Sequence, residues 1–176
     1  MPTYVCYLPR DRFSPDQKRQ IVDAITFRHS EATGAPSYFV QVVIEEARAD
    51  RYLGGEHTSD HIWVRGDIRA GRTEEQRTGM MTKMMQDISL VTSVRQENVW
   101  IYLCNLDPTD MIEYGHVLPA PGREEAWFES LPGSLFAQLG RVPTSQSERM
   151  RPSRAANHKQ STSGFRCELR AENALR

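Results

Sequence analysis

Two helix-initiation motifs of the same kind lie 59 residues apart, and each stands between two segments with the composition of β-strands. Ser14-Pro15-Asp16-Gln17 is a capping box with proline at the first helical position, and Thr73-Glu74-Glu75-Gln76 is a second capping box. The cap hydroxyls can accept hydrogen bonds from first-turn amides, and the early acids suit the positive end of the helix dipole. The repetition predicts a chain built from two β-α-β units.

The strands are expected at residues 3–8 and 38–45 in the first unit, and at 62–68 and 98–105 in the second. The segments FVQVVI and VWIYLC are dense in β-branched and aromatic residues. A strand, a helix and a strand within about 45 residues predict parallel strands joined by a right-handed crossover. We therefore expect an α+β fold, a four-stranded sheet with both helices on one face, with units at about 2–58 and 59–112 and short elements up to residue 140.

Each expected helix carries a stripe of apolar residues that we expect to face the hydrophobic core, although a Met-rich stripe can also form a binding surface. The first helix ends by Gly34. The stripes are Ile21, Ala24, Ile25 and Ala32 in the first helix, and Met81, Met84, Met85, Ile88 and Val91 in the second. The second face of the sheet is also apolar, and one chain offers no third layer to cover it, which predicts self-association.

Residues 141–176 differ in composition from the rest of the chain. They hold eight Lys or Arg against three Asp or Glu, whereas residues 1–140 hold 14 and 20. Few large apolar residues are present, so the composition predicts a solvated, disordered tail. A basic tail can touch nucleic acid, but Phe165 is its only aromatic residue, and we expect no nucleic-acid partner.

Composition also narrows the class of protein. No apolar run is long enough to span a membrane, and the beginning of the chain does not read as a secretory signal. Cys6, Cys104 and Cys167 are odd in number and contain no close pair, which argues against a disulfide scaffold and a zinc ribbon. We expect a cytoplasmic protein.

The chain enters its first expected strand directly after Met1-Pro2. Pro2 can simply begin that strand, where a missing amide costs nothing. If Met1 is removed, the Pro2 nitrogen becomes a secondary amine, and a terminal amine titrates near neutral pH. Burial lowers the pKa of such an amine and nearby carboxylates raise it, so it can serve as a proton donor or acceptor.

Arg69 and Arg72 flank a short turn before the second capping box. Two adjacent guanidiniums repel unless an anion lies between them, and the fork of each matches a carboxylate. The sequence predicts an anion clamp here, helped by the helix amides that follow. Two solvated loop arginines are the alternative.

Three further side chains are candidates for chemistry. His29 shares the inward face of the first helix, as a core residue or as a donor to a pocket. Tyr102 lies in VWIYLC, where it either packs across strands or presents its phenol to a substrate. Glu113 lies in MIEYG, either as a loop acid or as a base whose pKa is raised by apolar neighbours. His57 and His61 lie on a loop, where their spacing does not converge, and no metal site is expected.

Several of these stretches, in order, resemble the tautomerase superfamily, and more narrowly the cis-3-chloroacrylic acid dehalogenase family. They are Pro2 entering a strand, AITFRH with His29, HIWV before IRAGR, VWIY with Tyr102, MIEYG with Glu113, LPAPG and EEAWFESLP. The resemblance covers residues 2 to about 140 and implies a tandem β-α-β fold assembled as a homotrimer, without cofactor.

The resemblance also implies a role for each residue. Pro2 would donate a proton to the α-carbon, and Glu113, helped by Tyr102, would activate water. Arg69 and Arg72 would bind the carboxylate of a small-molecule substrate, with His29 assisting in binding and polarisation. The implied reaction is hydration or hydrolytic dehalogenation of a cis-3-haloacrylate or an acetylenic three-carbon acid, to give malonate semialdehyde.

Two other readings stay open. One is a keto-enol tautomerase for 2-oxo acids such as phenylpyruvate, in which Pro2 is neutral and acts as the base. The other is a non-catalytic trimeric binding module, which would follow if Met1 were retained and the nitrogen of Pro2 blocked.

Overall fold

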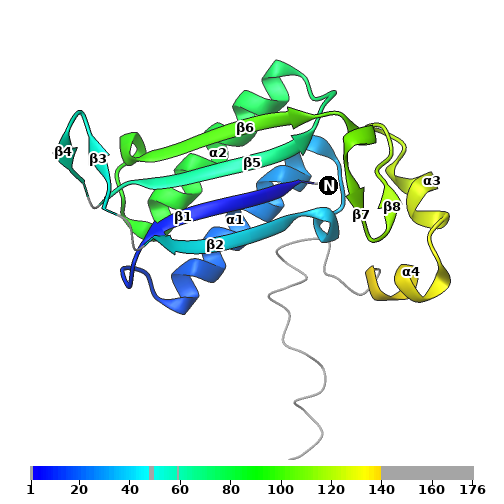
Figure 1. Ribbon diagram of the computed structural model, residues 1–176, viewed down its shortest axis with the longest axis horizontal. Helices are drawn as coiled ribbons and strands as arrows, with labels where there is room; N and C mark the ends of the chain where they lie inside the picture. The colour runs from blue at the N-terminus through cyan, green and yellow to red at the C-terminus, as the bar shows by residue number, and fades with distance from the viewer. Residues whose placement is uncertain (1, 48–49, 59, 140–176) are drawn as a thin grey trace, which may run out of the picture.

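The computed structural model describes residues 2–47, 50–58 and 60–139, and it contains the expected four-stranded sheet (Figure 1). The strand order is β2-β1-β5-β6, formed by Gln41–Ala47, Thr3–Pro9, Ile62–Arg69 and Val99–Leu106. β1 pairs parallel to β2 and β5 parallel to β6, as the β-α-β units require. The two units meet through the antiparallel pair β1 and β5.

Both helices start at the predicted capping boxes. Ser14 accepts from the amide of Gln17 ahead of α1 (Pro15–Thr33), and Thr73 accepts from the amide of Gln76 ahead of α2 (Glu74–Thr92). Gly34 ends α1 in the left-handed conformation, with φ of 72°. The two helices lie side by side on one face of the sheet (Figure 1).

The core lies between this helix layer and the sheet. The predicted stripe of α1 is right at Ile21, Ala24 and Ile25, which are buried. In α2 the fully buried residues are Met80, Met84 and Ile88, so the prediction that Met81 leads this stripe is wrong by one position. Met81 is only partly buried, because the row of α2 that faces the core follows a spacing of four residues, Met80, Met84 and Ile88, and Met81 lies beside it.

Short elements complete the described chain. Two strands start later than predicted because a 3₁₀ turn precedes each of them: η1 (Ser37–Phe39) before β2 and η2 (Gln96–Asn98) before β6. The others are β3 (Tyr52–Leu53), β4 (Glu56–His57), η3 (Pro108–Asp110), β7 (Ile112–Glu113), β8 (His116–Val117), α3 (Glu124–Glu129) and α4 (Gly133–Leu139).

A second, smaller core holds the C-terminal elements against one end of the sheet. Phe39 and Leu118 are its buried centre, and Tyr38, Met111, Trp127 and Phe128 pack around them. The indole of Trp127 donates to the carbonyl of Val117 at 2.9 Å, which ties α3 to β8. In Figure 1, β7, β8 and α3 accordingly lie beyond the end of the sheet where β1 begins and β5 and β6 finish.

The face of the sheet opposite the helices carries a row of aromatic rings. Tyr7 stacks on Trp63 with centroids 4.9 Å apart, and Trp63 meets Tyr102 edge-on at 5.7 Å. An ion pair between Arg65 and Asp67 lies on the same face, which is therefore aromatic but not uniformly apolar. The predicted tail, 141–176, falls outside the described residues. Within those residues, no helix has the length and hydropathy needed to cross a membrane.

Candidate active site

Pro2 and Arg69 lie at the same end of the sheet. The register of the antiparallel pair sets Thr3 opposite Asp67, so Pro2 is level with Ile68, next to Arg69. Pro2 is buried, and its carbonyl accepts from the amide of Gln41 at 3.0 Å. The start of one strand and the end of its neighbour therefore converge where the first unit meets the second.

The two arginines predicted to form a clamp come together there. Both guanidiniums reach the same oxygen, Oε1 of Glu124, at 2.5 Å from Arg69 and 3.5 Å from Arg72. Arg69 also donates to the carbonyl of Pro119 at 2.5 Å. The arginine side chains are only 4% and 8% exposed, so this is a buried ion cluster.

The turn between the arginines requires glycine. Gly71 has φ of 98°, which L-residues with a side chain rarely adopt, and a Cβ there would lie 2.9 Å from the ring of Pro121. The close approach brings the segment before α3 against the turn, and it places Glu124 within reach of both guanidiniums.

Glu124 is a site residue that sequence reasoning missed. Repulsion between the two guanidiniums requires an anion between them, and the sequence suggested only a substrate carboxylate for that place. Burial alone would raise the pKa of Glu124, yet its backbone hydrogen bond and the adjacent Arg69 and Arg72 outweigh this and lower it. Burial and the charge of Arg69 lower the pKa of Arg72.

His29 is buried and faces Tyr4. Its Nδ1 lies 2.8 Å from the hydroxyl of Tyr4, which also donates to the sulfur of Met80 at 3.7 Å. Burial, followed by the charge of Arg72, the amino terminus and Arg69, lowers the pKa of His29 to about 3. The imidazole is therefore neutral at neutral pH and can donate through one nitrogen only. Tyr4 was not singled out from the sequence.

Glu113 lies on the wall of a cavity at the same end of the sheet. It is half-buried on β7, and the two-residue turn Tyr114-Gly115, with φ of 52° and 79°, returns the chain to His116 on β8. Thr3, Gln41 and Tyr38 share the cavity, of about 530 Å³. Burial raises the pKa of Glu113, against the opposing charges of the amino terminus and Arg69. A carboxylate so placed is suited to accept a proton.

Among the predicted site residues, Tyr102 does not lie at this end of the sheet within one chain. It pairs with Arg65 in the sheet, four positions before the level of Arg69, which corresponds to roughly 13 Å along the strands. Its side chain is 51% exposed on the face opposite the helices, against Trp63. His57 and His61 are also remote, His57 on the β3–β4 hairpin and His61 bound to Thr58 through Nδ1 at 2.8 Å.

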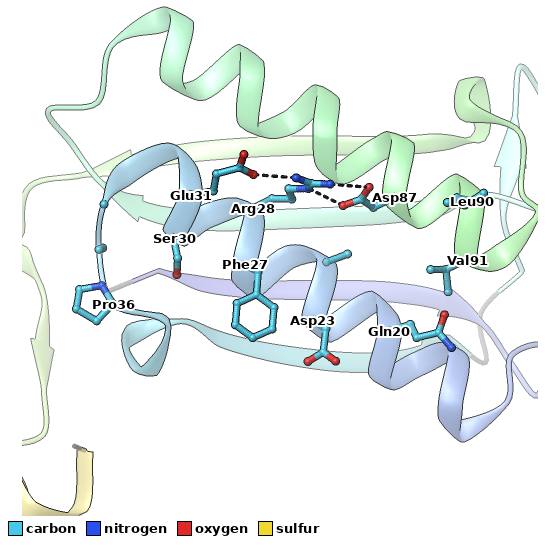
Figure 2. Close-up of a pocket in the computed structure, with 13 residues that line it drawn as sticks. Gln20, Asp23, Phe27, Arg28, Ser30, Glu31, Pro36, Asp87, Leu90 and Val91 are labelled. Atoms are coloured by element: carbon cyan, nitrogen blue, oxygen red, sulfur yellow. Dashed lines mark hydrogen bonds and ion pairs between the residues drawn. The ribbon is translucent and has the colours of Figure 1, made fainter. Parts of the chain in front are cut away.

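A larger cavity, of about 780 Å³, lies between the two helices (Figure 2). Figure 2 shows Arg28 of α1 directed toward Asp87 of α2 and toward Glu31, at 2.6 and 2.8 Å. None of the described residues that line it is a predicted site residue, and two of its three acids, Glu31 and Asp87, are bound by Arg28. We therefore place the candidate active site at the end of the sheet, not in this cavity.

The comparisons with known proteins identify the family and the fold. Residues 1–130 match a family model described as a putative oxalocrotonate tautomerase enzyme. The structure of N1, a member of the cis-3-chloroacrylic acid dehalogenase family, is 32% identical, covering 80% of this chain and 99% of its own, with a TM-score of 0.77.

Two other solved structures are less similar. R7 fused 4-OT, an asymmetric trimer, is 25% identical over 65% of this chain and 94% of its own, with a TM-score of 0.60. A macrophage migration inhibitory factor from Toxoplasma gondii shares the fold at 15% identity, 66% and 99% coverage and a TM-score of 0.57. No curated protein matches the chain. The family match and the identity to N1 show that this chain belongs to the tautomerase superfamily and, within it, to the cis-3-chloroacrylic acid dehalogenase family.

Proposed function

We propose that this protein is a cofactor-independent hydratase or hydrolytic dehalogenase that adds water to a small unsaturated three-carbon acid. The observation that carries the proposal is Glu113, a half-buried carboxylate of raised pKa on a cavity wall, at the same end of the sheet as Pro2 and the two arginines. A simple 1,3-proton shift needs no second base, whereas activation of water does.

In this reaction water attacks the β-carbon while Pro2 supplies a proton to the α-carbon. Negative charge builds toward the carboxylate, where Arg69 and Arg72 stabilise it more strongly than in the ground state. When the β-carbon bears a halide, the adduct expels halide and a proton and leaves malonate semialdehyde. When the substrate has a triple bond, hydration leads to the same product through its enol.

Arg72→Ala and Arg69→Ala should both raise KM and lower kcat, because the carboxylate is held in both states and more tightly in the transition state. Steady-state kinetics with cis-3-chloroacrylate and propiolate test this. Kinetics that do not change in either variant would contradict the assignment of the clamp.

We further propose that the protein is a homotrimer, like the fused 4-OT relative, and that the aromatic sheet face of Tyr7, Trp63 and Tyr102 lies at its subunit contacts. Within one chain Tyr102 does not line the cavity of Glu113. If it helps to position water, it must do so in the site of a neighbouring subunit. Sedimentation of the purified protein, with Trp63→Ser as the variant expected to dissociate, tests the assembly.

A second candidate is tautomerisation of an aromatic 2-oxo acid such as phenylpyruvate. It is favoured by the rings of Tyr38 and Phe39, which line the same cavity as Glu113 and against which the phenyl group of such a substrate would pack. Here Pro2 would be the base, and nearby cationic arginines would favour its neutral form.

A titration of the Pro2 nitrogen by ¹⁵N NMR separates these reactions, after intact-mass spectrometry has shown whether Met1 is removed. A pKa above neutral supports the hydratase, in which Pro2 is cationic. A pKa below neutral supports the tautomerase. Retention of Met1 would exclude both, because the nitrogen would be an amide, and would leave a binding module.

A further inference from the structure

Glu124 occupies the position between the two guanidiniums that a bound carboxylate would be expected to take. Its Oε1 lies 2.5 Å from Nη2 of Arg69 and 3.5 Å from Nη2 of Arg72. Its side chain is 16% exposed, so solvent screens these interactions little. With two guanidiniums and one carboxylate, the cluster carries a single net positive charge.

The two arginines are not equivalent in this cluster. Arg69 uses one terminal nitrogen on Glu124 and the other on the carbonyl of Pro119, each at 2.5 Å. Among the described residues, the guanidinium of Arg72 has only the longer ion pair with Glu124. Arg69 is therefore held by the protein, while Arg72 keeps most of its N–H donors for a ligand.

We propose that Glu124 sets the charge selectivity of the carboxylate site: it fixes Arg69 and leaves one net positive charge, presented mainly by Arg72, so that the site accepts a monoanionic acid and disfavours a dianion. This inference rests on the proposed function, because it assumes that the arginines bind the carboxylate of the substrate. It adds a positioning residue to that site and narrows the class of acid that the site accepts.

The physical basis is the repulsion between Glu124 and the ligand. A monoanion neutralises the single net positive charge of the cluster, whereas the second negative charge of a dianion is left without a cation and is repelled by the carboxylate of Glu124. In a partly buried site, one such interaction is worth roughly a tenfold change in Kd. Removing the charge of Glu124 should therefore improve the binding of a dianion about tenfold more than that of a monoanion.

The test is isothermal titration calorimetry of the full-length protein with propionate and with malonate, at pH 7.5 and constant ionic strength. Neither acid has a carbon-carbon multiple bond that could be hydrated. The wild type should bind propionate more tightly than malonate. Glu124→Gln should lower the Kd of malonate relative to that of propionate by roughly tenfold.

Two further variants separate charge from structure. Glu125→Gln removes an exposed charge from the next position of the same helix and should leave the ratio of the two Kd values unchanged. Glu124→Asp keeps the charge but shortens the side chain by one methylene group. The ratio of the two Kd values should therefore stay near that of the wild type even if the melting temperature falls.

Tighter binding of malonate than propionate by the wild type would overturn the proposal, whether or not the variants fold. An unchanged ratio of the Kd values of malonate and propionate in a folded Glu124→Gln variant would also overturn it. Failure of the wild type to bind either acid would overturn the proposed carboxylate clamp, and with it this inference.

Discussion

The hydroxyl of Tyr4 lies 2.8 Å from Nδ1 of His29, and both side chains are almost completely buried. Gly66, opposite Tyr4 on the neighbouring strand, makes room for the ring, since a Cβ at this position would collide with it. The pair links β1 to the last turns of α1.

Tyr4→Phe should lower the free energy of unfolding by about 1–2 kcal/mol, because it leaves the Nδ1 of His29 without its buried partner. Urea unfolding at a fixed protein concentration measures this. Tyr7→Phe is the control, because the hydroxyl of Tyr7 makes no hydrogen bond within the described residues and should cost little. Equal losses in the two variants would mean that the Tyr4–His29 contact contributes no stability of its own.

The depressed pKa of His29 predicts a loss of stability in mild acid. Burial, with the charges of Arg72, the amino terminus and Arg69, lowers the pKa of His29 to about 3. The unfolded chain, with a His pKa of about 6.5, therefore binds more protons than the folded chain between these values. Stability consequently falls as pH decreases through this window, by at most about 1.4 kcal/mol per pH unit.

Unfolding curves between pH 7 and pH 4 for the wild type and His29→Asn check this prediction. The variant should show a shallower dependence on pH, since asparagine does not titrate. Parallel curves for the two proteins would mean that other groups account for the acid sensitivity.

The geometry around Glu124 predicts that substituting Arg69 and Arg72 lowers the free energy of unfolding by unequal amounts. Arg69→Ala should lower the free energy of unfolding by about 3 kcal/mol, because it removes the 2.5 Å partner of a nearly buried carboxylate and the donor to Pro119. Arg72→Ala should cost less, since its ion pair with Glu124 is 3.5 Å long. Thermal unfolding compares the variants, and a greater loss for Arg72→Ala would contradict this assignment.

Substitution of two glycines should shift stability in opposite directions. Gly71→Ala should cost 1 kcal/mol or more, on the order of the usual penalty for positive φ, in addition to the contact with Pro121. Gly79→Ala, on the exposed side of α2 with no atom within 4 Å of the new Cβ, should gain roughly 0.5–1 kcal/mol. The melting temperatures of the two variants report both changes, and destabilisation by Gly79→Ala would refute the second.

Several parts of the fold could be predicted because they depend on residues close together in the chain. The capping boxes at Ser14 and Thr73 start both helices, since each needs only residues three positions apart. Gly34 ends the first helix for an equally local reason. The parallel pairing within each unit followed from the length of its crossover. Within the methionine stripe only Met81 was misplaced, with Met80 buried instead, because packing against the sheet decides which side of a helix faces inward.

The amino-acid sequence by itself thus determined the order of the four main strands and two long helices, the two-unit architecture and the candidates Pro2, His29, Arg69, Arg72 and Glu113. The tertiary structure alone decided that Glu124, 52 residues after Arg72, supplies the anion between the arginines. It also decided that Tyr102 lies on the open face of the sheet, four positions from the level of Arg69 within one chain. Both depend on strand register and on how the C-terminal segment packs, and such contacts between distant residues leave no periodicity or spacing in the chain.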